Sequence, residues 1–376
     1  VEVLKGSNAI LFGNVAAGGI LNLVTKKPKF ENGGEISMRT GSYDFYKPAV
    51  DVYGAVNGSD HVAYRVNTSY ENSRSFRNNV TGERFYVNPS LLVKAGKKTE
   101  ILLEGDYLKD TRTLDYGVGA INYELIDVPR DRFLGSSWSY FNGVQRTSTL
   151  TITHPVNSNW QLRGLTSYQE FTSDIFGTTR PNSGNFVKTN GTWVRNLQRS
   201  ESEQDYYLGQ LDLTGKFSTG PITHTLLVGA DMDKYSTKNL AYVGLTKYDS
   251  INVFDLNLYP QRSDIPSLTI NTKSQNPIHR VGAYIQDLVS ITEELKLLAG
   301  IRYSYIDFKN TIYTLARQAP AQTSRYYDNA FSPRVGIVYQ PLKTVSLFAS
   351  YSNSFVPNNA KDVNNAALPP SIIDQY

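Results

Sequence analysis

The chain has 376 residues, with 38 Lys and Arg against 34 Asp and Glu, so its formal net charge is only +4. An excess this small and dispersed argues against nucleic acid as a partner. There is no cysteine, which excludes disulfides, thiolate metal sites and cysteine nucleophiles. The four histidines lie too far apart in the sequence to suggest a zinc site.

No apolar run approaches the roughly 18 residues that a membrane-spanning helix needs, and the mean hydropathy is −0.36. A transmembrane β-barrel is compatible with this value, because its strands alternate apolar and polar residues and so average to mild hydrophilicity. No basic segment with an apolar core follows Val1. We therefore expect either a chain whose signal peptide has been removed or a fragment of a longer protein.

Residues 1–29 differ from the rest of the chain. Residues 20–24 are mostly apolar on both faces, which predicts a strand buried inside a globular domain. Gly13 and Gly18 precede it and indicate tight turns. Their spacing is that of a phosphate-binding loop, but the Lys-Ser/Thr pair that such a loop requires does not follow. A basic segment at 26–29 then leads into the remainder of the chain.

From residue 30 onward, apolar and polar residues alternate with period 2, which predicts strands with one apolar and one polar face. The pattern is clear in residues 62–70, 100–107, 295–305 and 345–354. About thirteen such strands are expected. They begin near Gly34, Phe45, His61, Arg84, Thr99, Gly143, Trp160, Glu203, Ile222, Ile278, Glu293, Asn329 and Val345.

The connections between these strands alternate between short turns and long loops. Turns rich in Gly, Asn, Pro and Ser are expected at one end of the strands. Long loops are expected at the other end, at 111–142, 174–200, 237–277 and 310–328. This is the organisation of an outer-membrane barrel, whereas a soluble sandwich or propeller normally buries its apolar face and keeps its loops short.

Tyrosines near the expected strand ends indicate an aromatic girdle at the membrane interface. These residues are Tyr70, Tyr107, Tyr168, Tyr303, Tyr305, Tyr339 and Tyr351. The sequence therefore predicts an all-β protein, with an antiparallel transmembrane β-barrel as its main element. An open sheet would leave unpaired backbone groups in lipid, and bacterial single-chain barrels have an even number of strands. About thirteen strands therefore indicate a partial barrel.

Several segments resemble TonB-dependent outer-membrane receptors, most closely ferric-siderophore receptors of the ferrichrome-receptor kind. They include VEVLKG at 1–6, AGGILNLVTKKP at 17–28, FSPRVGIVYQP at 331–341 and SLFASYSNSF at 346–355. The resemblance implies that residues 1–29 are the C-terminal part of a plug domain. It also implies that residues 30–376 are the N-terminal portion of a 22-stranded barrel with long extracellular loops. The region that contacts TonB would then lie upstream of Val1.

No catalytic constellation is present: no H-E-x-x-H, no G-x-S-x-G, and no Ser, His and Asp on known motifs. We therefore expect a binding protein and not an enzyme. A ferric siderophore is bulky and often anionic, so aromatic and cationic side chains in the long loops are the candidates for contact. The candidate ligand-binding residues are Tyr116, Trp138, Tyr140, Phe176, Trp193, Tyr259 and Tyr313.

Charged residues on the polar face of the strands are expected to point inward and to bond the plug to the barrel wall. From the alternation alone, these are Arg65, Glu104, Asp106, Arg163 and Arg302.

The function implied by the resemblance is import of a ferric siderophore across the outer membrane of a Gram-negative bacterium, driven by TonB through rearrangement of the plug. The expected partners are the siderophore, TonB, outer-membrane lipid and lipopolysaccharide. No resident cofactor is expected, since ferric iron is part of the cargo. Other cargoes on the same fold stay open, including cobalamin, haem, a nickel chelate and an oligosaccharide. The positions of the histidines, in or near strands, disfavour haem. A passive porin-like channel is the other alternative.

Overall fold

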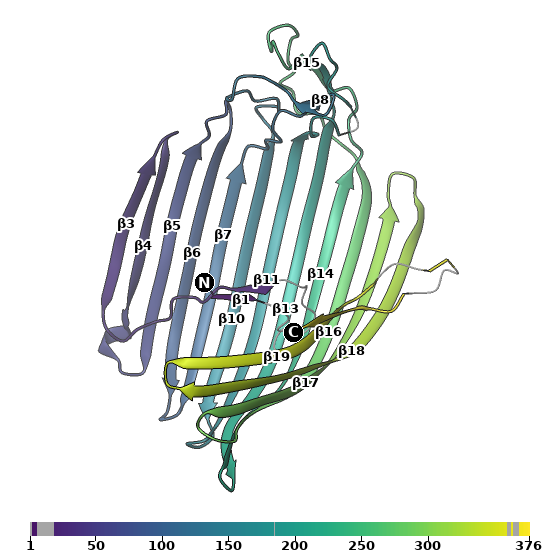
Figure 1. Ribbon diagram of the computed structural model, residues 1–376. Coiled ribbons are helices and arrows are strands. Elements are labelled where there is room, and N and C mark those ends of the chain that lie inside the picture. Colours follow the sequence, from purple (N-terminus) through teal and green to yellow (C-terminus); the bar gives the residue numbers. More distant parts are fainter. Residues whose placement is uncertain (1, 6–18, 184, 359–361, 364–367) are drawn as a thin grey trace.

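A computed structural model describes residues 2–5, 19–183, 185–358, 362–363 and 368–376. Its main element is a curved, antiparallel 14-stranded sheet in which each strand pairs with its neighbours in the sheet order (Figure 1). The strands of this sheet are β3 (Gly33–Gly41), β4 (Phe45–Ala55), β5 (Val62–Arg74), β6 (Thr81–Ala95), β7 (Thr99–Arg112), β10 (Tyr140–Pro155), β11 (Trp160–Thr178), β13 (Leu197–Thr219), β14 (Ile222–Tyr242), β16 (Ile270–Ser290), β17 (Leu295–Thr314), β18 (Ala319–Leu342), β19 (Val345–Val356) and β20 (Ser371–Gln375).

Three short strand pairs complete the structure. β1 (Glu2–Lys5) pairs with β2 (Gly19–Asn22), β8 (Ala120–Ile121) pairs with β9 (Glu124–Leu125), and β12 (Thr192–Arg195) pairs with β15 (Asp249–Asn252). A single 3₁₀ turn, η1, covers Val56–Gly58. In the described part of the chain, no helix has the length and apolarity needed to cross a membrane.

The thirteen strands expected from the alternation are confirmed, and β20 is a further strand that the sequence pattern did not predict. Three of the four long loops are confirmed with narrower bounds, at 113–139, 179–196 and 243–269. The fourth prediction is wrong, because β17 continues to Thr314 and β18 begins at Ala319. Along β17 the outward positions here are polar (Asp307, Lys309, Thr311), so the outer apolar stripe of residues 295–305 stops although the backbone stays paired.

The distribution of side chains on the two faces of the sheet is the reverse of that in a soluble protein, with apolar residues exposed and polar residues covered. Because register partners share a face, Leu211, Met232 and Val281 fall together on the outer face, where Leu211 and Met232 are 54% and 62% exposed. On the inner face Arg302 is 4% exposed and Asp212 is 9% exposed. The apolar stripe of residues 295–305 is likewise left exposed rather than covered by a second layer. This confirms the expected arrangement of apolar residues outside and polar residues inside.

Aromatic residues form two rims on the outer face. Near the lower turns, Trp160 stacks on Phe217 with ring centroids 6.3 Å apart. About midway along β11 and β13, the ring centroid of Tyr168 lies 4.8 Å from that of Tyr207. Tyr168 lies eight residues beyond Trp160 on β11, which corresponds to roughly 26 Å along the strand and roughly 20 Å after allowance for strand tilt. The apolar band between these aromatic residues is therefore slightly shorter than the roughly 25 Å band typical of outer-membrane barrels.

Side chains on the inner face form a network within the sheet itself. Arg302 on β17 donates to both carboxylate oxygens of Asp231 on β14, at 2.6 and 2.8 Å. Its guanidinium lies across Gly282, where a Cβ atom would collide with it. The ring of Tyr284 covers Gly229 in the same way, and its hydroxyl donates to Asp212. Glycine at these two strand positions lets large polar side chains lie flat along the wall.

The segment before β3 contacts the inner face of the first strands. Lys26 pairs with Asp51 at 2.8 Å, and Arg65 donates to the carbonyl of Lys27 at 3.1 Å. Thr25 donates to Glu104 at 2.5 Å. The predicted role of Arg65 and Glu104 in holding residues 1–29 to the wall is thus confirmed for this segment.

Among the described residues, the other three inward side chains bond to other strands of the sheet and not to the segment before β3. Asp106 accepts from Gln145, Arg163 pairs with Asp212, and Arg302 pairs with Asp231. The expected burial of residues 20–24 also differs from the structure, in which Leu21 and Leu23 are 70% and 75% exposed. Gly13 and Gly18, with their expected turns, lie outside the described residues.

We predict that Gly282→Val destabilises the barrel by about 3 kcal/mol, because the new side chain displaces Arg302 from Asp231 and leaves a buried carboxylate unpaired. Urea unfolding of the full-length receptor in lipid vesicles measures this loss. Gly164→Ala is the matched control, since a Cβ atom there makes only an ordinary 3.9 Å contact with Leu211. Equal stability of the two variants would contradict the wall-packing role of Gly282.

Candidate functional site

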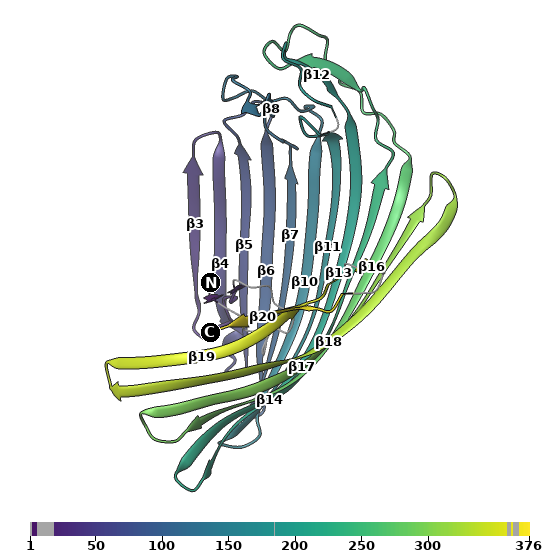
Figure 2. The same cartoon turned by 45° about the vertical axis from the view of Figure 1, so that its right-hand side comes forward.

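The three long loops gather above one end of the sheet, over β7, β10, β11, β13, β14 and β16 (Figure 2). They share a small hydrophobic core of their own. Its buried members are Ile126, Leu134, Val187, Trp193, Ile251 and Val253. Because these residues come from all three loops, the loops form one packed unit, which we call the loop cluster.

A buried ion pair fastens this cluster. Arg195 on β12 binds Asp249 on β15 in a bidentate pair through Nε and Nη2, on one edge of the guanidinium, with 2.7 Å from Nε to Oδ1. Its remaining donor, Nη1, reaches the carbonyls of Leu134 and Gly135 in the first loop, at 3.2 and 2.8 Å. The Arg195 side chain is 1% exposed. One guanidinium therefore joins all three loops, and its buried charge is neutralised by Asp249 and hydrogen-bonded on every side.

A second apolar group lies at the base of the loops. Trp138 packs edge-on against Phe176 and Tyr248, with centroid distances of 5.0 and 6.0 Å. The Trp138 indole donates to the Tyr248 hydroxyl at 3.2 Å, and that hydroxyl donates to the carbonyl of Asp264 at 2.7 Å. Burial raises the pKa of the Tyr248 phenol. It therefore stays protonated at neutral pH and keeps its donor role.

Two of the sequence-predicted ligand residues lie in these apolar cores. Trp193 is 1% exposed and Phe176 is 3% exposed, so neither presents surface to a ligand in this structure. Trp138 is half-buried in the same group as Phe176. Tyr140 is also half-buried, and its hydroxyl donates to Asp174 at 2.9 Å. By strand alternation, Tyr140 and Phe176 lie on the outer face of the sheet.

The other three predicted residues lie apart from this group and from one another. Tyr259 is an exposed residue of the third loop. Tyr313 lies near the end of β17 instead of in a loop, with the Lys273 ammonium 5.8 Å from its ring centroid. Tyr116 lies on the inner side, where its hydroxyl accepts from Gln198 at 2.9 Å. The Arg180 guanidinium lies 5.2 Å from the Tyr116 ring centroid.

A set of inward-facing aromatic residues on the upper strands was missed by the sequence reasoning, which looked for ligand contacts only in loops. Each is half-buried and shares the inner face with Arg302 or Asp212 by strand alternation. The set consists of Tyr86, Phe141, Phe171, Tyr206, Tyr235, Phe308 and Tyr326. The alternation that assigned the inward charges would also have identified these residues.

Cations and carboxylates lie among these aromatic side chains. The Arg112 guanidinium is 4.5 Å from the ring centroid of Phe141. Arg280 binds Asp233 at 2.8 Å beside Tyr206. We call this aromatic and charged inner surface, together with Tyr116 and Arg180, the upper inner wall. It can hold a bulky ligand that combines flat apolar groups with anionic oxygens. No group of three or more potential metal-ligating side chains occurs among the residues whose placement is described.

Comparison with known proteins assigns this architecture. The family model for "TonB dependent receptor-like, beta-barrel" matches residues 86–376. The chain belongs to this family. Members are outer-membrane proteins of Gram-negative bacteria, so the outer face of the sheet faces lipid and the inner face lines the barrel. The protein is a receptor component and not an enzyme.

Curated relatives of this TonB-dependent receptor chain are receptors for metal chelates. It is 29% identical over 376 residues to the metal-pseudopaline receptor CntO of Pseudomonas aeruginosa, covering 98% of this chain and 52% of that protein. It is 24% identical to the ferrioxamine B receptor of Salmonella typhimurium, covering 98% of this chain and 51% of that protein. The chain thus spans about half the length of the curated relatives it matches.

Solved structures share the fold. The siderophore receptor PiuA from Acinetobacter baumannii superposes with a TM-score of 0.85 at 19% identity, covering 98% of this chain and 57% of that one. The ferripyoverdine receptor of Pseudomonas aeruginosa, in a crystal structure bound to ferripyoverdine, has a TM-score of 0.81 at 23% identity. That match covers 98% of this chain and 48% of the other.

We predict that Arg195→Met loosens the loop cluster, because it leaves the buried Asp249 carboxylate without its partner, at a cost of about 3 kcal/mol. Limited proteolysis of the full-length receptor should show faster cleavage within 179–196 and 243–269. Arg325→Met is the control, since Arg325 makes a similar two-point contact with Asp307 but is 64% exposed. If both variants resist protease like the wild type, the ion pair does not fasten the loops.

Proposed function

We propose that this chain forms part of a TonB-dependent outer-membrane receptor that binds a ferric siderophore beneath its extracellular loops and imports it through rearrangement of the plug. Residues 1–29 are assigned to the end of the plug and residues 30–376 to the barrel. The observation that carries the proposal is the upper inner wall, where half-buried aromatic rings and cations face the barrel interior below a preassembled loop cluster. The similarity to a metal-pseudopaline receptor and to a ferrioxamine B receptor supports this cargo class.

Two arginines are the best candidates for contact with an anionic chelate. Arg180 is exposed and makes no ion pair within the described part of the chain. Arg112 has only a 3.9 Å contact with Asp110, and its side chain is 52% exposed. Both guanidiniums lie on aromatic rings, which hold them in place at little cost in side-chain entropy. Of the seven loop residues predicted from the sequence, Tyr116 lies in this region and is the one we carry into the binding site.

The further partners in the proposal follow from the family. TonB supplies the energy and acts on the receptor outside the region described, while outer-membrane lipid and lipopolysaccharide surround the outer face. Iron enters as part of the cargo, with no resident cofactor required. A second cargo is favoured by one observation, the similarity to a metal-pseudopaline receptor. A chelate of that kind, carrying another metal, would use the same aromatic and cationic surface.

We predict that Arg180→Gln in the full-length receptor weakens binding of its ferric siderophore about tenfold, because a charge-assisted contact to the chelate is lost. Tyr116→Ala should cause a similar loss by removing both a ring contact and the support of Arg180. Binding of radiolabelled iron chelates to whole cells measures the effect. Arg146→Gln, on the outer face and paired with Glu170, should leave binding unchanged. Equal effects at positions 146 and 180 would argue against the upper inner wall as the site.

We also predict that growth on the ferric siderophore as sole iron source requires both the receptor and TonB. Deleting the gene for the receptor, or that for TonB, should abolish uptake at sub-micromolar chelate. Uptake that persists without TonB would instead identify a passive channel. A panel of hydroxamate and catecholate chelates and of metal-pseudopaline, compared by competition for binding, would identify the cargo. Competition by an oligosaccharide alone would overturn the siderophore assignment.

A further inference from the structure

The upper inner wall carries an unbroken row of large apolar side chains on one side of the sheet. Its members are register partners on β13, β14, β16, β17 and β18, so they lie next to one another on the inner face. They are Tyr206, Tyr235, Ile278, Phe308 and Tyr326. We call this row the apolar belt. All five side chains are half-buried and so keep some surface free, and four steps between adjacent strands make the belt roughly 19 Å long.

The inner face around the apolar belt offers no free charge. On these five strands, all of whose residues are described, every inward position between the belt and the loop end is uncharged. Below the belt, Arg280 pairs with Asp233 and Arg302 pairs with Asp231. The belt therefore suits an uncharged, apolar part of a ligand.

The inner face of β3 to β7 carries a charged row instead. One residue from each strand contributes to it, and neighbours in the row are register or ion-pair partners. The row consists of Arg39, Lys47, Glu71, Arg84 and Asp110. Arg112 lies on the same face of β7, two residues nearer the loops than Asp110. Together the row and Arg112 hold four cations against two carboxylates, which leaves positive charge for the anionic oxygens of a ligand.

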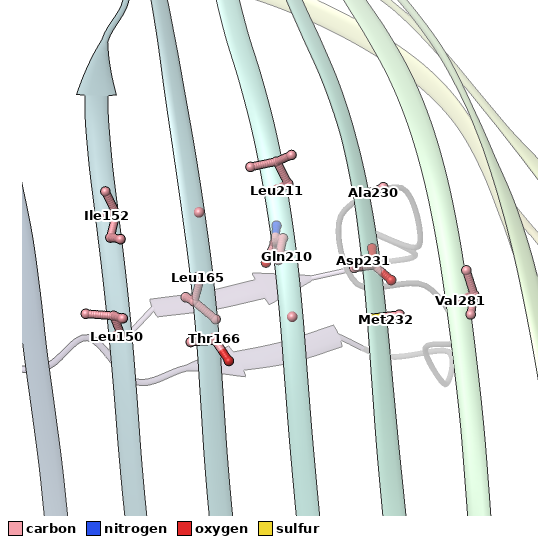
Figure 3. A pocket seen from close by; sticks show the side chains of 12 residues that line it. Leu150, Ile152, Leu165, Thr166, Gln210, Leu211, Ala230, Asp231, Met232 and Val281 are labelled. Carbon is pink, nitrogen blue, oxygen red and sulfur yellow. The ribbon is translucent and has the colours of Figure 1, made fainter.

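The apolar belt needs a partner that neither lipid nor the described segment before β3 supplies. Lipid accounts for apolar side chains on the outer face of the same strands, such as Leu211, Met232 and Val281 (Figure 3), but does not reach the inner face. The side-chain bonds described for residues 25–27 go to β4, β5 and β7, away from the belt. An aryl group would cover only part of a line of five side chains, whereas an extended hydrocarbon chain would cover all of it.

We propose that the cargo is an amphiphilic ferric chelate, in which an anionic chelating head carries a long acyl tail. The head lies at the charged row and Arg112, and the tail lies along the apolar belt. Arg112 on β7 and Tyr206 on β13 are three strand steps apart, or roughly 14 Å, so one bound molecule can reach both surfaces. This inference rests on the proposed function and names a narrower class of cargo within it.

Two pairs of synthetic ferric chelates test this inference, one pair with a tris-catecholate head and one with a hydroxamate head. Within each pair, one chelate carries an acetyl group and the other a dodecanoyl chain. Binding is measured on purified full-length receptor in lipid vesicles, after subtraction of the amount that enters receptor-free vesicles. In at least one pair the dodecanoyl member should bind about tenfold more tightly, because the belt removes its methylene groups from water.

Variants of the receptor assign this preference to the apolar belt. Ile278→Thr with Phe308→Thr keeps residues that favour strands but makes the centre of the belt polar, so the preference should fall to about twofold or less. The same two substitutions at exposed positions of the outer face, Ile285→Thr with Phe331→Thr, are the matched control and should keep the full preference. Arg84→Gln should weaken both members of a pair and keep the ratio between them, because only the head loses a contact. Heat-induced mobility shift on gels confirms that each barrel is folded, and Ile278→Thr alone replaces the double variant if that variant does not fold.

A photoreactive diazirine at the end of the tail locates it directly, and the labelled peptides should come from β16, β17 or β18. Labelling of β3 to β7, or a preference that survives in the belt variant, would overturn the inference. Equal binding of the two members of each pair, as expected if the plug covers the belt, would also overturn it and leave the proposed function standing. Wild-type receptor that binds none of the four chelates would overturn the proposed function, and this inference with it.

Discussion

The structure depends on one constraint: in hydrocarbon, every backbone donor and acceptor must find a partner within the protein. Long antiparallel strands meet this requirement through their neighbours, and the side chains are then free to divide by face. Leu211 and Met232 point into lipid, while Arg302 and Asp231 pair in the interior of the barrel. The loops above this sheet experience no such constraint. They are ordered by different means, a small apolar core and the Arg195–Asp249 ion pair.

The fastening of the loops bears on how a ligand is captured. Three independent loops would each lose conformational entropy when they close over a chelate. Here Arg195 joins all three before any ligand arrives, so most of that ordering has already taken place on folding. The proposed binding surface below, at Tyr116 and Arg180, is likewise positioned by contacts within the protein. The geometry is thus that of a preorganised receptor.

Much of the fold could be predicted from the sequence, because strand alternation is a local property. The apolar stripe at residues 295–305 was enough to predict a strand, to tell its apolar face from its polar face, and to predict that the apolar face lies against lipid. β20 was missed because five residues next to a segment rich in Asn, Ala and Pro carry too little pattern. The β17–β18 hairpin was taken for a loop because strands above the membrane need no apolar face. In both cases the segment forms a strand because a neighbouring strand pairs with it. A short stretch of sequence does not show which strand that neighbour is.

The burial of the candidate ligand-binding residues could not be predicted from the sequence, for a physical reason. Composition shows which loops are aromatic but not which rings stabilise the loops themselves, and Trp193 and Phe176 proved to be core residues. Burial depends on contacts between distant segments, such as 126–134 with 187–193 and 251–253. The inward aromatic residues, Phe141 and Tyr206 among them, were accessible to the alternation rule but were not sought on strands.

The self-pairing of charges on the inner wall has a consequence for traffic through the barrel. Along β13 to β17, Arg302 and Arg280 are neutralised by aspartates of the wall itself. On the opposite side, Asp51 and Arg65 reach across to residues 26 and 27, and separation there must break ionic contacts. Among the described residues, the two sides of the wall therefore differ. One side pairs its charges internally, and the other holds residues 26 and 27 through charged contacts. In the proposed function, a plug that moves would therefore separate more readily from the side along β13 to β17 than from the side that holds residues 26 and 27.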